Sequence, residues 1–185
     1  MIRPNPVNRL QQLKDAGIVY VDNFQIRGFF DEFRFLSNFH VTPVHFNGND
    51  YMSSEHAYMA AKARNKKDHD YVQSAKSCSQ AKKRGSEIEL VDDWELMKVE
   101  IMYLINLNKY SNPTMAALLA TTGNQYLEET NWWGDKIWGV CEGIGQSLLG
   151  RVIMQVRTEL GISDIVLRRD PTWRLDEAVA LSKEP

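Results

Sequence analysis

The sequence predicts a single α+β domain that is mostly helical, with a small sheet or hairpin near its N-terminus. With 185 residues, the chain is long enough to bury one substantial core and short for two. Between residues 25 and 51, aromatic and β-branched residues alternate with turn formers, and after residue 53 apolar residues recur at helical spacing. The regular strand and helix alternation of a doubly wound fold is absent from this pattern.

The chain is expected to consist of a core with two extensions. We place an N-terminal extension at residues 1–28, the domain at residues 29–161 and a C-terminal extension at residues 162–185. The first extension contains an apolar pattern that predicts a short helix, which should end near Gly17. No internal repeat or low-complexity segment interrupts this organisation.

Composition excludes several classes of protein. The formal net charge is −2, so any contact with a polyanion must be local. No run approaches the roughly 20 apolar residues of a membrane helix, and the N-terminus lacks the apolar centre of a signal peptide, which predicts a cytoplasmic protein without membrane contact. Two cysteines cannot make a disulfide framework, and the four histidines are not spaced as a metal cluster. We expect no metal and no cofactor.

The strongest local signals are a hairpin and the helix that follows it. Asn47-Gly48 stands between two short apolar runs and predicts a two-residue hairpin turn. Ser53 or Ser54 can cap a helix, because a serine side chain accepts a hydrogen bond from a free N–H of the first turn. The alanines that follow are good helix formers with a small-residue face.

Three further helices are expected. Asp92 or Asp93 is placed to cap a helix with a core-facing apolar stripe. A shorter helix is expected at residues 114–121. Another should begin near Gly145 and stop at Gly161, since glycine is favoured after the last helical residue.

Glu55 and His56 fall in the first turn of the helix after the hairpin, which makes them candidates for chemistry. Lys62 lies seven residues on, so its side chain shares a helix face with Glu55 and the two can converge on one ligand. On these residues alone, the simpler interpretation is that Glu55 only complements the positive end of the helix dipole and that Glu55 and Lys62 are a solvated pair of charges.

Two other groups carry similar alternatives. Trp132, Trp133, Asp135 and Trp138 crowd into a loop broken by glycines, where tryptophans either fill the core or stack against a base. A basic group before Gly85 is either a solvated helix face or a phosphate clamp, and it consists of Lys76, Lys82, Lys83 and Arg84.

A series of short motifs runs in order between residues 29 and 158. The series comprises Phe35-Leu36-Ser37-Asn38-Phe39, Tyr51 to Tyr58 with Ser54-Glu55-His56, Lys62, Ala81-Lys82, Gly85, Trp94-Glu95 with Lys98, Leu118-Leu119, Gly123, Leu127-Glu128, Asp135, Trp138-Gly139, Leu149-Gly150-Arg151, Met154 and Arg157. In order and spacing, these motifs resemble the NADAR family, also called YbiA-like. The sequence departs from the family pattern at Met59, Ser86 and Gln146, where glutamine, arginine and asparagine are common.

The resemblance implies an N-glycosidase that hydrolyses a ribosyl C1′–N bond in a nucleotide-like substrate. It implies that Glu55, Lys62 and Asp135 are catalytic. It further implies a set of substrate-binding residues, namely Asn38, Phe39, His56, Lys82, Arg84, Trp94, Trp138 and Gly139. Lys62 could act as a cation or as an amine that forms a Schiff base with the opened sugar.

Three functions remain open at this point. Family members act on a ribosylamino-pyrimidine phosphate of riboflavin synthesis or remove ADP-ribose from guanine bases, including guanine in nucleic acid. The basic residues near Lys82–Arg84 and at Arg168-Arg169 favour ADP-ribosylated guanine, because a larger polyanion needs more cations. A module that binds ADP-ribose without cleaving it is the alternative outside the enzymes.

Overall fold

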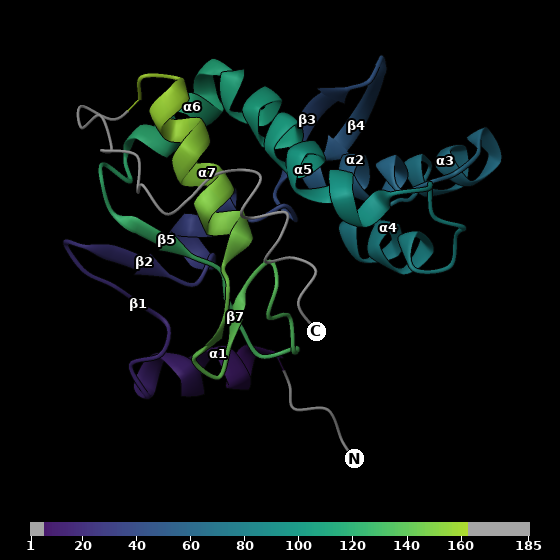
Figure 1. Cartoon of the computed structure of the whole chain (residues 1–185). Coiled ribbons are helices and arrows are strands. Elements are labelled where there is room, and N and C mark those ends of the chain that lie inside the picture. The colour runs from purple at the N-terminus through teal and green to yellow at the C-terminus, as the bar shows by residue number, and fades with distance from the viewer. Residues whose placement is uncertain (1–5, 163–185) are drawn as a thin grey trace.

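The computed structural model describes residues 6–162, which form eight helical segments and eight short strands (Figure 1). The helices are α1 (Pro6–Asp15), the 3₁₀ helix η1 (Asp31–Leu36), α2 (Ser54–Ala61), α3 (Lys66–Gln73), α4 (Cys78–Gly85), α5 (Trp94–Ser111), α6 (Pro113–Ala120) and α7 (Leu148–Glu159). The strands are β1 (Tyr20–Val21), β2 (Gln25–Arg27), β3 (Val41–Phe46), β4 (Asn49–Ser53), β5 (Tyr126–Glu128), β6 (Thr130–Asn131), β7 (Val140–Cys141) and β8 (Ile144–Gly145). The predicted α+β class with mostly helical content is confirmed.

The described strands form three small sheets, where we expected one near the N-terminus. Their orders are β1-β2-β5, β3-β4 and β6-β7-β8. The pairs β2·β5 and β6·β7 are parallel, and β2·β5 brings together two segments that lie far apart in the sequence. The strands after residue 125 were not predicted, because two or three residues are too few to show an alternating pattern.

The predicted hairpin is confirmed as β3 and β4. Asn47 and Gly48 both have left-handed backbones, with φ of 48° and 75°, as the favoured two-residue turn requires. Strand β4 runs directly into α2, where Ser53 is the N-cap and its side chain accepts a hydrogen bond from the backbone N–H of His56. The hairpin therefore fixes the position of the first turn of α2.

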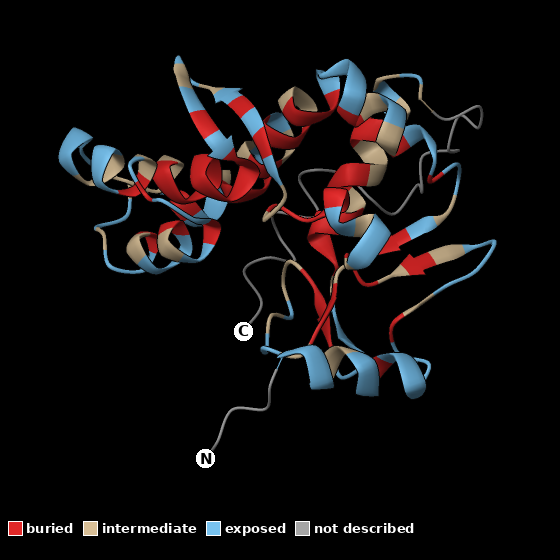
Figure 2. Cartoon of the chain, turned by 180° about the vertical axis from the view of Figure 1, so that it is seen from behind, coloured by how far each residue is buried: buried red, intermediate tan, exposed pale blue. Residues whose placement is uncertain are grey.

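Helix α2 lies in the interior, and residues 54–60 are all buried (Figure 2). It packs against α3, α4 and α5 and against the hairpin strands. Ala57 and Ala60 are almost fully buried, and their small side chains let neighbouring elements approach closely. A charged residue on this helix is consequently held inside the protein, where ionisation is costly.

The starts of α5 and α7 differ from the prediction. Asp93 precedes α5, but its backbone is left-handed, with φ of 57°, and its side chain makes no capping hydrogen bond. Helix α7 begins at Leu148, three residues later than Gly145, because Gly145 belongs to strand β8. Residues 113–120 form α6, close to the predicted range.

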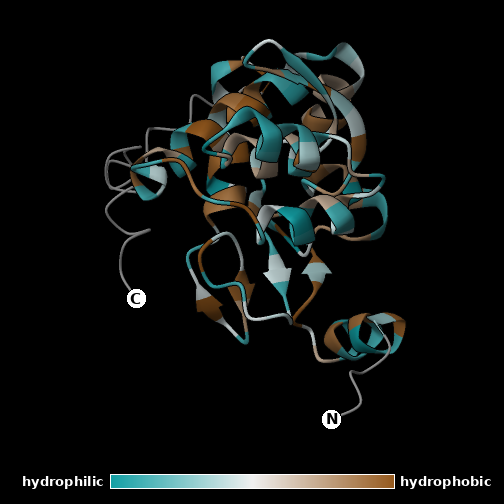
Figure 3. Ribbon diagram, turned by 90° about the vertical axis from the view of Figure 1, so that its right-hand side faces the viewer, coloured by the Kyte–Doolittle hydropathy of each residue, from teal (hydrophilic) through white to brown (hydrophobic). Residues whose placement is uncertain are grey.

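Helix α1 lies at the edge of the molecule and is mostly exposed (Figure 3). The side chains of Leu13 and Val19 are buried and attach this segment to the rest of the protein. Gly17 follows the helix with φ of 64°, as expected for a glycine that ends a helix. Strands β1 and β2 fall within the predicted N-terminal extension, yet β2 pairs with β5. The boundaries of the extensions stay predictions, and Arg168-Arg169 lies outside the described residues.

Candidate active site

Glu55 is buried at the start of α2, with 5% of its surface exposed. Its backbone N–H donates to the carbonyl oxygen of Asn38 at 3.0 Å, and its Oε1 is buried with no hydrogen-bond partner among residues 6–162. Burial raises the pKa of the Glu55 carboxyl to about 7, nearby Asp135 adds to this, and Lys82 and Lys62 oppose it. The carboxyl can thus accept or release a proton near neutral pH.

Lys62 follows the last turn of α2 and is partly buried. Its Nζ donates to the carbonyl oxygen of Gly85 at 3.0 Å and lies 3.7 Å from the Sδ of Met59. Burial lowers the pKa of Lys62, while the charges of Glu55 and Glu95 raise it. One of the departures from the family pattern, Met59, therefore contacts a candidate catalytic side chain.

Three aromatic rings pack beside these charges. The Tyr58 ring lies 5.2 Å from Trp94 and 5.4 Å from Trp138, between ring centroids. Burial, followed by the nearby charge of Glu55, raises the pKa of Tyr58 well above its usual range. Tyr58 was not among the predicted site residues, although its position three residues after Glu55 places it on the same helix face.

The loop before β7 is organised by two side chains. Asn131 Oδ1 accepts hydrogen bonds from the backbone N–H groups of Trp133 and Asp135, each at 3.2 Å. Asp135 Oδ1 in turn accepts from the N–H groups of Ile137 and Trp138, at 3.0 and 2.8 Å. Asp135 therefore holds Trp138 in place in addition to lying near Glu55.

The tryptophans predicted as one group separate in the structure. Trp138 packs on Tyr58, whereas Trp132 stacks on Phe30 with ring centroids 5.4 Å apart. Trp133 meets Trp132 edge-on and remains 49% exposed. Only Trp138 joins the aromatic rings near Glu55.

Lys82 is exposed, and it lies beside the partly buried Phe39 and near Glu55. The Nζ of Lys82 lies 5.8 Å from the centroid of the Phe39 ring, and Arg34 approaches the same ring at 5.8 Å. Lys82 is also the largest favourable charge acting on Glu55. This arrangement offers a cation and an aromatic surface to a ligand.

Arg84 and His56 make contacts on other sides of their helices. The guanidinium of Arg84 donates to the Tyr71 carbonyl oxygen and the Ser74 hydroxyl, and lies 4.4 Å from the centre of the Tyr71 ring. His56 bonds through Nδ1 to Ser53 Oγ at 2.8 Å, and burial lowers its pKa. These contacts hold Arg84 against α3 and His56 against the N-cap of α2, and the substrate-binding role of both residues stays a prediction.

Gly139 allows two strands to approach closely. A Cβ atom at this position would lie 2.4 Å from the carbonyl oxygen of Glu129 and 2.5 Å from Asn131 Nδ2. Glu129, which the sequence analysis did not select, is half-buried near Glu55 and Asp135. The adjacent pair Glu128-Glu129 is a signal that could have found it, because successive side chains of a strand point to opposite faces.

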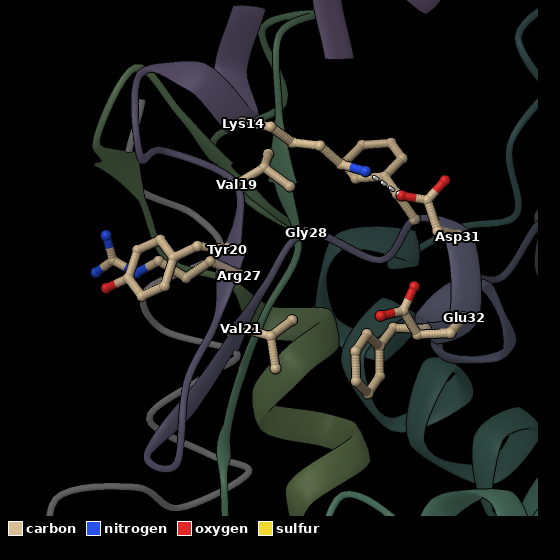
Figure 4. Close-up of a pocket in the computed structure, with 10 residues that line it drawn as sticks. Lys14, Val19, Tyr20, Val21, Arg27, Gly28, Asp31 and Glu32 are labelled. Atoms are coloured by element: carbon tan, nitrogen blue, oxygen red, sulfur yellow. Dashed lines mark hydrogen bonds and ion pairs between the residues drawn. The ribbon is translucent and has the colours of Figure 1, made fainter. Parts of the chain in front are cut away.

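A hollow of 310 Å³ lies apart from this cluster (Figure 4). Its lining comes from α1, β1, β2 and η1 and includes the ion pair of Lys14 and Asp31. None of the predicted site residues lines it. Within residues 6–162, no group of histidine, cysteine and acidic side chains could hold a metal ion, and no helix is long and apolar enough to cross a membrane.

Comparison with known proteins decides the family. Residues 24–161 match the NADAR domain. This chain belongs to the NADAR family. A riboflavin biosynthesis protein of Vibrio vulnificus is 33% identical over 133 residues, which cover 68% of this chain and 35% of that protein. N-glycosidase YbiA of Escherichia coli is 28% identical over 139 residues, which cover 71% of this chain and 84% of YbiA.

The NMR structure of E. coli YbiA supports the same assignment. It superposes with a TM-score of 0.68 at 27% identity and covers 78% of this chain and 90% of YbiA. The NADAR match includes every candidate site residue from Asn38 to Gly139. This chain spans about a third of the length of the Vibrio protein, and 24% of a related chloroplastic riboflavin biosynthesis protein of Zea mays.

Proposed function

We propose that this NADAR protein is an N-glycosidase that hydrolyses the ribosyl C1′–N bond of a phosphorylated, nucleotide-like substrate. The observation that carries the proposal is the buried carboxyl of Glu55, whose Oε1 has no partner among the described residues and whose pKa is about 7. A buried polar atom without a partner is uncommon, so it is suited to a ligand. The names of the YbiA relatives support the same reaction class.

The residues around Glu55 match the needs of this reaction. Cleavage of a ribosyl C–N bond builds positive charge on the sugar, which a nearby carboxylate stabilises. Glu55 can supply that charge and can take a proton from the attacking water. Asp135 adds a second carboxylate, while Tyr58 and Trp138 offer flat surfaces against which the base can stack.

Cations near the site suit a phosphate. Lys82 is exposed, and both Lys82 and Lys62 lie near enough to Glu55 to lower its pKa. One phosphate group could therefore be bound by these two cations, between α2 and α4. The basic group gives less support to a larger polyanion than the sequence suggested. Arg84 is engaged with Tyr71, and Lys83 lies 3.9 Å from Glu87.

The first candidate substrate is therefore a ribosylamino-pyrimidine phosphate. It carries one base and one phosphate, in keeping with one aromatic cluster and the Lys82 side chain. The names of the Vibrio and Zea relatives, both riboflavin biosynthesis proteins, support this candidate.

The second candidate is ADP-ribose attached to guanine. One observation favours it: Trp133 is 49% exposed on the loop that carries Asp135, where it could stack against a second base. This candidate requires the protein to accept two bases and a diphosphate.

Product analysis tests the proposal. The purified chain is incubated with each candidate, and the free base is quantified by chromatography. We expect release from at least one substrate, and the ratio of kcat/KM between the two assigns the class. Tight binding of ADP-ribose without release of base from either substrate would identify a binding module and overturn the proposal.

A further inference from the structure

Glu129 is held on a rigid part of the backbone beside the candidate site. It lies between β5 and β6, and its backbone N–H donates to the hydroxyl of Ser147 at 3.2 Å. Its carbonyl oxygen accepts from the N–H of Val140 at 2.9 Å, next to the close approach of Gly139. The side chain therefore leaves the backbone from a fixed point.

Glu129 and its neighbour Glu128 have different surroundings. Glu128 accepts a hydrogen bond from Thr130 Oγ1 at 2.9 Å and lies 3.6 Å from Arg27. The carboxyl of Glu129 makes no hydrogen bond or ion pair with any residue from 6 to 162. Its role is thus not explained by the packing of the strands.

Charged groups from several elements face Glu129. Asp135 of the β6–β7 loop and Glu55 of α2 are negative. Lys82 of α4 and Arg34 of η1 are positive, and the buried Lys109 of α5, whose pKa burial lowers to about 7, also interacts with Glu129. Three carboxyls consequently share one site, which favours a proton on one of them.

Partial burial and two negative neighbours favour the protonated form of Glu129. Burial raises the pKa of the Glu129 carboxyl to about 8, and Asp135 and Glu55 add to this effect against Lys82 and Arg34. The pKa values of Glu129 and Glu55 both lie well above that of an exposed carboxyl, so this pair of carboxyls retains a proton near neutral pH. Two neighbouring carboxyls that retain a proton can divide the roles of acid and base, and the carboxyl of Glu129 has no partner that would hold it away from a ligand.

We propose that Glu129 is the general acid that protonates the leaving nitrogen while Glu55 acts as the general base. This inference rests on the proposed function. Glu55 takes a proton from water as the water oxygen bonds to C1′. The C1′–N bond breaks with its electron pair on nitrogen, and the Glu129 proton bonds to that nitrogen. Proton exchange with solvent then restores both carboxyls.

Asp135 is less suited to the same task. Its Oδ1 accepts two backbone hydrogen bonds, from Ile137 and Trp138, and these depend on its acceptor character. A proton donor needs a carboxyl that is free to turn toward the ligand. Among the described carboxyls that face Glu55, Glu129 meets this condition.

A titration tests the proton on Glu129 without any substrate. Through-bond NMR of the ¹³C-labelled protein follows the side-chain carboxyl of Glu129 from pH 5 to pH 10, a range of about five units chosen to bracket both carboxyls. We expect a midpoint above 7, and a lower midpoint in Glu55→Gln, because that variant removes a negative neighbour. A Glu129 carboxyl that is ionised throughout this range would overturn the proposal, whatever the protein hydrolyses.

Kinetics test the proton transfer. For a substrate that the wild type cleaves, Glu129→Gln should lower kcat at least about 100-fold, since glutamine cannot give up a proton. The wild-type rate should fall as the pH rises past the Glu129 pKa, and the variant should lose this dependence. Glu142→Gln, an exposed change in the turn between β7 and β8, is the matched control. A normal kcat with an unchanged alkaline limb in Glu129→Gln would refute the role, whereas an inactive wild type with a protonated Glu129 would refute only the proposed function.

Discussion

The backbone N–H of Glu55 donates to the carbonyl oxygen of Asn38 across 3.0 Å, and the side chains of both residues bury an oxygen without a partner among residues 6–162. These oxygens are Glu55 Oε1 and Asn38 Oδ1. The hydrogen bond joins the turn after η1 to the first turn of α2. Each of these oxygens can accept a hydrogen bond from a donor-rich ligand, such as a ribose with its hydroxyls.

Replacement of Glu55 by glutamine should separate activity from stability. Glu55→Gln removes the carboxylate, so we expect kcat to fall at least about 100-fold. The folded protein should become more stable at high pH, because ionisation of the buried carboxyl opposes folding. Steady-state kinetics and urea unfolding at two pH values measure both effects.

The pH dependence of that stability has a defined sign. The folded pKa of Glu55, about 7, exceeds the ordinary value of 4.5, so the folded state binds the extra proton between these values. As the pH rises from 4.5 to 7, the free energy of unfolding of the wild type should fall relative to that of Glu55→Gln. Above pH 7, this difference should stay constant at roughly 3 kcal/mol. The exposed Glu100→Gln variant should show no such difference. Equal stability of wild type and Glu55→Gln at pH 8 would contradict the burial argument.

The sequence was most informative where local chemistry decides structure. Asn47-Gly48 predicted the hairpin because few residue pairs adopt two left-handed conformations in succession. Ser53 predicted the start of α2, because a serine side chain satisfies an N–H of the first turn. Together they placed Glu55 correctly at the start of that helix.

Features that depend on tertiary contacts were harder to predict. The direction of Arg84, toward Tyr71, depends on how α3 packs against α4. The parallel pairing of β6 with β7, which brings Glu129 beside Gly139, joins segments too short to carry a pattern. A single sequence does not encode such contacts in any local signal.

The two chemical roles left open for Lys62 can be distinguished. Burial lowers the pKa of Lys62, Glu55 and Glu95 oppose this effect, and the Nζ donates to the Gly85 carbonyl oxygen at 3.0 Å, a bond that directs it away from a sugar aldehyde. We therefore expect an electrostatic role. Lys62→Arg should keep at least a tenth of the activity and Lys62→Met should lose about 100-fold, as loss of one charge-stabilising group does.

Borohydride trapping provides the decisive measurement for Lys62. Reduction during turnover should give no adduct by mass spectrometry, because no Schiff base forms. Lys67→Met, an exposed change on α3, should leave kcat and KM unchanged. A reduced sugar adduct on Lys62, together with an inactive Lys62→Arg variant, would instead establish the covalent role.

Gly139→Ala should damage both stability and activity. The added methyl group would lie 2.4 Å from the Glu129 carbonyl oxygen and 2.5 Å from Asn131 Nδ2, so β6 and β7 must separate. We expect a loss of at least about 2 kcal/mol in the free energy of unfolding, in the range of overpacked sites.

Gly143→Ala is the control for this change. A methyl group there meets nothing within 4 Å, and φ of 76° alone makes the change unfavourable by about 1 kcal/mol. Urea unfolding compares the two variants. If Gly139→Ala were the milder of the two, the close approach of the strands could not be required for the fold.

Lys82 and Arg84 lie two residues apart on α4 and should respond differently to truncation. Lys82 is exposed beside Phe39 and near Glu55, so Lys82→Ala should raise KM for a phosphorylated substrate about tenfold or more with little change in stability. Arg84 bonds to Tyr71 and Ser74, so Arg84→Ala should lower the free energy of unfolding by about 1–2 kcal/mol and leave KM unchanged. Kinetics and urea unfolding of both variants check this contrast. A raised KM in Arg84→Ala, with wild-type KM in Lys82→Ala, would place the phosphate on the α3 side of α4 and displace the binding site proposed between α2 and α4.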